Sequence, residues 1–114
     1  MTIKEIAALL DAEILTGDPR SPREYRNAFS SDMMSDALAY GRENSLLLTG
    51  LLNQQAIRTA EMIDMHAVIF VRGKMPSKEI LELAEQKGIA VLRTGHGLFT
   101  ASGLLYQEGM RGGM

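Results

Sequence analysis

Three short apolar runs that lack polar alternation constrain the fold of this chain more than any other feature. They are SLLLT at residues 45–49, HAVIFV at 66–71 and IAVL at 89–92. A strand with one face in water alternates apolar and polar residues, whereas a strand buried on both faces is apolar throughout. The three runs therefore predict neighbouring parallel strands in a sheet that is covered by helices.

Amphipathic segments and short strands surround these runs. Thr2 and Glu5 form a capping-box pattern ahead of the first apolar helix face. Helices are predicted at Thr2–Leu10, from Ser31 or Asp32 to Tyr40, from Asn53 to Ile63, at Ser77–Lys87 and at Gly97–Tyr106, and further strands at Glu13–Thr16 and Tyr25–Ser30. Strands that alternate with helices through short turns build a parallel sheet. We therefore expect an α/β fold with two or three layers and a mainly parallel sheet of about four to six strands. It should form a single domain over residues 1–108, followed by a flexible tail at 109–114.

Composition excludes several classes of function. A net charge of -2 leaves no basic surface for nucleic acid or an anionic membrane. The absence of cysteine excludes disulfides, thiolate metal sites and cysteine nucleophiles. The opening MTIKEIAALLDAE is charged and amphipathic, without the apolar core of a signal peptide, and no run is long enough to span a bilayer. A cytoplasmic location is the expectation.

Polar and glycine residues gather where the predicted strands end. Ligands of open parallel sheets bind beyond the carboxyl ends of the strands, where helix N-termini favour anions. Arg72 and Lys74 lie at this edge and would attract a phosphate or a nucleotide. His66 opens a buried strand and is interpreted as structural. The alternative is that the edge residues serve only as helix caps and turns. The candidate ligand contacts are Asp32, Thr49, Gly50, Asn53, Arg72, Gly73, Thr94 and His96.

Motifs of catalysis and cofactor binding are incomplete. GHGLFT at residues 95–100 approaches the dinucleotide-binding pattern, but threonine replaces its third glycine and no strand follows. GLLNQQAI at 50–57 lacks the Lys-Ser/Thr pair of a phosphate-binding loop. No nucleophile elbow and no metal-ligand spacing are present. We therefore predict no catalytic residue, no metal and no cofactor.

Several segments, taken in order, resemble the DRTGG domain family over Gly17–Tyr106. They are SSDMMSDAL, SLLLTG, AVIFVRGKMPSKEILELAEQKGIAVLRT and GLFTASGLL. The resemblance implies a fold similar to the N-terminal domain of HPr kinase/phosphorylase and a tendency to dimerise. Such domains occur alone, or as regulatory inserts between paired CBS domains in some family II inorganic pyrophosphatases, and have no established activity of their own. The family's Asp-Arg pair is replaced here by Gly50-Leu51-Leu52-Asn53, and its Thr-Gly-Gly by Arg72-Gly73-Lys74, so that only Gly73 matches.

The leading hypothesis is a non-catalytic, dimeric regulatory or adaptor domain. It would sense a small anionic, nucleotide-like ligand or dock a partner enzyme of redox or other metabolism. One alternative is a small enzyme acting on a phosphorylated substrate around Arg72 and His96, and another is a purely structural dimerisation module. Eight methionines suit an adaptable contact surface. The dimer interface is predicted at the helix Asp32–Tyr40 or around Met62 and Met65.

Overall fold

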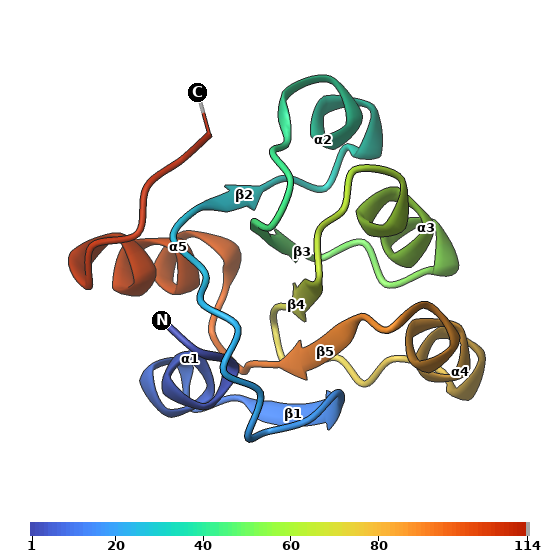
Figure 1. The fold of residues 1–114 in the computed structure, drawn as a ribbon, viewed down its shortest axis with the longest axis horizontal. Helices are drawn as coiled ribbons and strands as arrows, with labels where there is room; N and C mark the ends of the chain where they lie inside the picture. Colours follow the sequence, from blue (N-terminus) through green and yellow to red (C-terminus); the bar gives the residue numbers. More distant parts are fainter. Residues whose placement is uncertain (114) are drawn as a thin grey trace.

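A five-stranded sheet forms the centre of the molecule in the computed structural model, which describes residues 1–113 (Figure 1). The strand order is β1-β5-β4-β3-β2. Four strands are parallel, namely β2 (Ala28–Ser30), β3 (Leu46–Thr49), β4 (Ala67–Phe70) and β5 (Ala90–Arg93). At one edge β1 (Glu13–Thr16) pairs with β5 in the antiparallel sense. The predicted α/β class and the mainly parallel sheet are confirmed.

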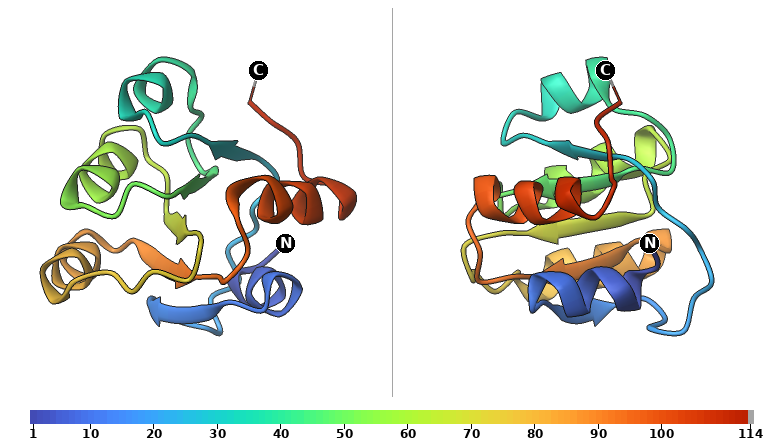
Figure 2. Two further views of the ribbon diagram at one scale, coloured as in Figure 1. Left: turned by 180° about the vertical axis from the view of Figure 1, so that it is seen from behind. Right: turned by 90° about the vertical axis from the view of Figure 1, so that its left-hand side faces the viewer.

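Helices cover both faces of this sheet and make three layers (Figures 1 and 2). One face carries α1 (Ile3–Leu10) and α5 (Leu98–Gln107), and the other carries α2 (Met34–Tyr40), α3 (Gln54–Met62) and α4 (Lys78–Lys87). Each parallel strand is followed by a helix, as short crossover connections require. No helix within the described residues combines the length and apolar character that crossing a bilayer demands.

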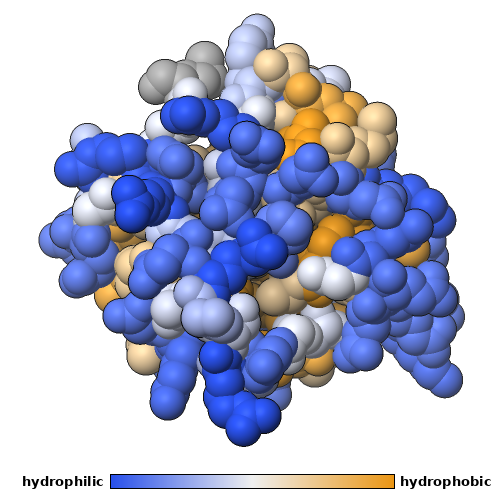
Figure 3. Space-filling view, viewed as in Figure 1, coloured by the Kyte–Doolittle hydropathy of each residue, from blue (hydrophilic) through white to orange (hydrophobic). Residues whose placement is uncertain are grey.

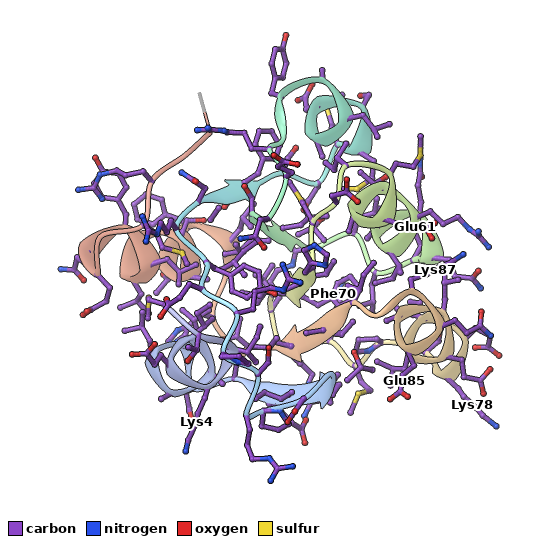
Figure 4. The ribbon with its side chains drawn as sticks, viewed as in Figure 1. Lys4, Glu61, Phe70, Lys78, Glu85 and Lys87 are labelled. Atoms are coloured by element: carbon purple, nitrogen blue, oxygen red, sulfur yellow. The ribbon has the colours of Figure 1, made fainter. Side chains whose placement is uncertain are left out.

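The central strands are buried on both faces, which explains their unbroken apolar sequences. In β3, Leu46 and Leu48 pack with α1 and α5, whereas Leu47 packs with the three helices of the other face. Successive residues of a strand point to opposite faces of the sheet, so the residues on both faces must be apolar here. Phe70 packs on the face of the sheet that is covered by α2, α3 and α4, and Figure 4 shows it near the centre of the molecule. The residues predicted to be buried are all fully enclosed: Leu47, Val68, Ile69, Phe70 and Val91.

Local signals placed several helix ends correctly. The Thr2–Glu5 capping box is present at α1, and the side chain of Ser77 accepts a hydrogen bond from Ile80 N at the start of α4. Gly88 ends α4 with a φ of 68°, a left-handed conformation in which glycine carries no steric penalty. Between α3 and α4, Glu61 and Lys87 form an ion pair of 3.1 Å (Figure 4).

Two predicted boundaries are wrong. Strand β2 begins at Ala28 and not at Tyr25, because the Tyr25 backbone N–H donates to the carbonyl of Met1 and its side chain is buried. Helix α2 begins at Met34 after an N-cap at Met33 that makes no side-chain capping bond. The helical spacing of Met34, Ala37 and Leu38 predicts that all three face inward, but Leu38 is 42% exposed.

The glycine-rich residues after α5 contact the sheet beyond the expected domain boundary at residue 108. The Met110 side chain is buried in the core. The Arg111 carbonyl accepts a hydrogen bond from Ala28 N, and Arg111 forms a parallel bridge with Asn27. Packed structure therefore continues through at least Arg111, into the segment predicted as a flexible tail.

Candidate functional site

The carboxyl ends of the parallel strands form one continuous edge. Beyond the last paired residues, Val71 N donates to Thr49 O at 3.2 Å and Thr94 N donates to Phe70 O at 3.0 Å. Ser31 N donates to Leu48 O at 3.1 Å in the same way. The loops that follow β2, β3, β4 and β5 therefore lie side by side, as the sequence predicted.

The loop after β4 is a tight turn fixed to the loop after β5. Arg72 and Gly73 both have positive φ, 65° and 70°. Arg72 N donates to His96 O, and Gly73 N donates to Thr94 O, each at 2.8 Å. A residue other than glycine is uncommon in this conformation. These bonds hold Arg72 in it and so fix where its side chain leaves the backbone.

The Arg72 side chain lies across Gly50 in the neighbouring loop. Its Nη2 is 3.5 Å from Gly50 O, and a Cβ placed on Gly50 would lie 2.6 Å from the guanidinium carbon. A side chain at position 50 would therefore require the guanidinium to move from this place. Within residues 1–113, Arg72 takes part in no ion pair, whereas Arg93 is bound to Glu13 at 3.0 Å. Arg72 therefore presents an exposed cation without a carboxylate partner.

Ser31 or Asp32 is the residue that the sequence offers as the N-cap of this helix, but the N-cap of α2 is Met33 and the Asp32 side chain does not cap it. Its Oδ1 accepts hydrogen bonds from Gly50 N at 2.6 Å and from Thr49 Oγ1 at 3.3 Å. A backbone N–H and a hydroxyl are the donors that a bound phosphate would use. Asp32 thus places a carboxylate of the protein itself at an anion-binding position beside Arg72.

Three other predicted contacts use their polar atoms within the protein. The buried Thr49 hydroxyl also accepts a bond from Leu51 N at 3.1 Å. The buried Thr94 hydroxyl donates to Leu10 O at 2.7 Å and accepts from His96 N at 3.3 Å. Asn53 Oδ1 caps α3 by accepting from Ala56 N. These side chains shape the loops, and because Gly73 N already donates to Thr94 O, the groups left to meet a ligand are the side chains of Arg72 and His96.

His96 lies on the open rim of this edge. Its side chain is partly exposed between Gly95 and Gly97, and a Cβ on either glycine would meet nothing within 4 Å. Gly97 begins α5 without a side-chain capping bond. The His96 ring makes no hydrogen bond to any described residue, and the same part of the chain holds no cluster of acidic and histidine side chains fit for a metal ion. The edge offers cationic and backbone donor groups but no assembled catalytic set.

A polar hollow at the opposite edge was not predicted. It lies before the amino ends of β2, β3 and β4, has a volume of about 630 Å³, and is called here the amino-edge hollow. Figure 3 shows hydrophilic side chains across the middle of one face of the molecule. The one available signal was the recurrence of polar and charged residues just before each apolar run. The hollow is lined by Arg23, Asn27, Arg42, Glu43, Asn44, Asp64 and His66.

Burial and the nearby Arg23 lower the pKa of His66, and Asp64 partly offsets this. The imidazole is therefore mainly uncharged near neutral pH, because its pKa moves down from an ordinary value of 6.5. His66 was interpreted as the first residue of the buried strand, but β4 begins at Ala67, and His66 lies in the loop just before it with its side chain lining the hollow.

Comparison with known proteins agrees with this fold. The chain is 30% identical over 101 residues to the cobalt-dependent inorganic pyrophosphatase of Clostridium perfringens (strain 13 / Type A), a match that covers 84% of this chain and 18% of that enzyme. A crystal structure of the CBS and DRTGG domains of the regulatory region of Clostridium perfringens pyrophosphatase, complexed with the activator diadenosine tetraphosphate, superimposes with a TM-score of 0.76. Its sequence identity is 25%, over 93% of this chain and 46% of that one.

The family comparison covers almost the whole chain. The family model described as the DRTGG domain matches residues 5–107, from within α1 to the end of α5. The match thus includes every strand and each of the loops at the carboxyl edge. The chain belongs to the DRTGG domain family.

Proposed function

We propose that this domain is a non-catalytic regulatory module that binds a nucleotide-like anion at the carboxyl edge of its sheet. The observation that carries the proposal is the placement of Arg72. Its guanidinium lies over Gly50, is exposed, and has no carboxylate partner among the described residues. The backbone beneath it is held by the bonds to His96 O and Thr94 O.

A guanidinium fixed in this way suits a phosphate group. Its planar set of N–H donors binds phosphate oxygens in pairs, and charge-assisted bonds of this kind are stronger than neutral ones. Because the turn is already ordered, binding costs less conformational entropy than it would in a mobile loop. His96 and the uncapped start of α5 provide further donors nearby. A nucleotide-like ligand is supported by the related pyrophosphatase region, whose CBS and DRTGG domains were crystallised with diadenosine tetraphosphate.

The test is thermal denaturation with AMP, ADP, ATP and diadenosine tetraphosphate as probes. A ligand present at about one hundred times its Kd adds about 2.7 kcal/mol to the free energy of unfolding. Arg72→Ala should abolish the ligand-induced rise in Tm and leave the unliganded Tm nearly unchanged. Arg20→Ala, which alters an exposed arginine in the β1–β2 connection, is the matched control. Equal binding by Arg72→Ala and wild type would overturn the proposal.

A second role, dimerisation or docking through α2, is supported by exposed apolar side chains. At this helix Met33, Leu38 and Tyr40 are 60%, 42% and 52% exposed, and Figure 3 shows an apolar area over α2. Met62 on the adjacent α3 is 70% exposed. Met65 cannot belong to such an interface, because it is only 1% exposed and packs inside the core. We propose that this surface joins two copies of the domain or contacts the enzyme that it regulates.

A further inference from the structure

The amino-edge hollow is open to solvent, and its volume falls within the roughly 300–1,000 Å³ that small-molecule sites span. Its walls come from the β1–β2 connection, from the loop between α2 and β3, and from the loop between α3 and β4. It lies at the end of the sheet opposite Arg72. Whatever binds there does not depend on the anion site proposed above.

Asn44 joins these loops and fixes one wall of the hollow. It has a left-handed φ of 57°, and its N–H donates to Asp64 O at 2.8 Å. Its Oδ1 accepts from Arg23 Nη1 at 3.0 Å, and its Nδ2 donates to Glu24 O at 3.2 Å. Both the oxygen and the nitrogen of the Asn44 side-chain amide are thus hydrogen-bonded. The guanidinium of Arg23 is held by an uncharged partner, so its charge is not neutralised.

Charges of both signs line the hollow without pairing. Arg23 and Arg42 bring two positive charges, and Glu43 and Asp64 bring two negative ones. No ion pair joins any of these four side chains to another described residue, although pairs such as Lys87–Glu61 form elsewhere on the surface. Within residues 1–113 the Arg42 guanidinium also makes no hydrogen bond. The hollow therefore offers cationic and anionic groups together.

We infer that the amino-edge hollow binds a small zwitterion of the α-amino acid class. The ligand carboxylate would bind the guanidinium of Arg42 beside Arg23, and the ligand ammonium would bind Asp64. The half-buried ring of His66 would contact the remainder of the ligand. The charges of the lining side chains sum to zero, so the hollow exerts no net attraction on a polyphosphate. A bound polyphosphate would also place its negative charge next to the two carboxylates, which repel it. A ligand with one charge of each sign satisfies both sets of groups.

The two histidines of the chain make a direct test, because His66 lines this hollow and His96 lies at the opposite edge. Ring signals of both are followed by two-dimensional NMR while the common L-amino acids are titrated one at a time into the millimolar range. At least one amino acid should shift the His66 signals saturably and leave those of His96 in place. Its N-acetyl and carboxamide derivatives, which each lack one charge, should bind about tenfold more weakly or worse.

Variants complete the test. Arg42→Gln and Asp64→Asn should each weaken binding about tenfold, since each removes one charge-assisted contact. Asparagine tolerates the left-handed φ of 54° at position 64, and unchanged His96 signals report that the fold is intact. Arg72→Gln should bind as wild type does. The inference is overturned if no amino acid shifts His66, if acetate or inorganic phosphate shifts it equally well, or if both hollow variants retain full affinity.

Discussion

Replacing Asp32 with asparagine would test whether the Asp32 carboxylate weakens anion binding at the proposed site by repelling the anion. Asparagine keeps an oxygen that can accept from Gly50 N, which Asp32 does now at 2.6 Å, and it removes only the negative charge. Arg72 lies over the same glycine, so an anion bound to Arg72 would place its charge near the Asp32 carboxylate. For a separation of about 6 Å and an effective dielectric constant of about 40, one unit charge repels another by about 1.4 kcal/mol. Asp32→Asn should therefore bind the anion about tenfold more tightly.

Isothermal titration with ATP and diadenosine tetraphosphate measures this gain. The free energy of unfolding should fall by about 0.5–1.5 kcal/mol, because a charge-assisted bond becomes a neutral one. The gain in affinity should shrink as salt is added, since salt screens exposed charges. If Asp32→Asn binds no more tightly at low salt while Arg72→Ala still abolishes binding, the anion does not lie beside Asp32, and the reasoning fails.

Four further measurements address the fold and its surfaces. Phe70→Ala, which empties a fully buried ring position, should lower the free energy of unfolding by about 3–5 kcal/mol in urea titrations, and a loss below about 1 kcal/mol would contradict the packing described. Gly50→Ala should weaken anion binding, but less than Arg72→Ala does, because the new methyl group displaces the end of the Arg72 side chain without removing its charge; unchanged affinity would show that this placement is unimportant. Leu38→Glu should convert a dimer into monomers in sedimentation at micromolar concentration, and a wild-type monomer there would contradict the interface. The folded-state pKa of His66 lies below its unfolded value of 6.5, so protonation favours unfolding and stability should fall as pH drops below that value. His66→Gln should flatten this dependence in urea titrations, and an unaltered slope would refute the assignment.

Residues whose role is set by local sequence or by two-sided burial were predictable. The run at residues 66–71 is apolar because both faces of β4 are buried, so its two-sided burial could be read from the sequence. Asn53 and Ser77 were predicted as helix caps, since a capping bond spans only three residues. The gathering of the loops at one carboxyl edge then followed from the parallel sheet.

Long-range contacts account for what was missed. Asp32 stands where a cap is expected, but its partner is Gly50 N, eighteen positions away, which no local pattern records. One wall of the amino-edge hollow is formed by Arg23, which lies in the long, irregular β1–β2 connection and donates a hydrogen bond to Asn44. Met110 lies among glycines that suggested a loose tail, yet its side chain fills space beside the core. In each case the tertiary structure, and not the local sequence, decides the role.

The connection between β1 and β2 is also a mechanical anchor for both ends of the described chain. Tyr25 N is bonded to Met1 O at 2.8 Å, and Arg111 N is bonded to Arg26 O at 3.2 Å. A force applied to either terminal segment is therefore transmitted to Tyr25 or Arg26, and from the C-terminal segment also to β2, because Ala28 N donates to Arg111 O at 3.0 Å. In the sequence, Tyr25 and Arg26 lie between Arg23 and Asn27, which line the amino-edge hollow. A structure joined to either terminal segment would thus be coupled through hydrogen bonds to the connection that forms one wall of the hollow.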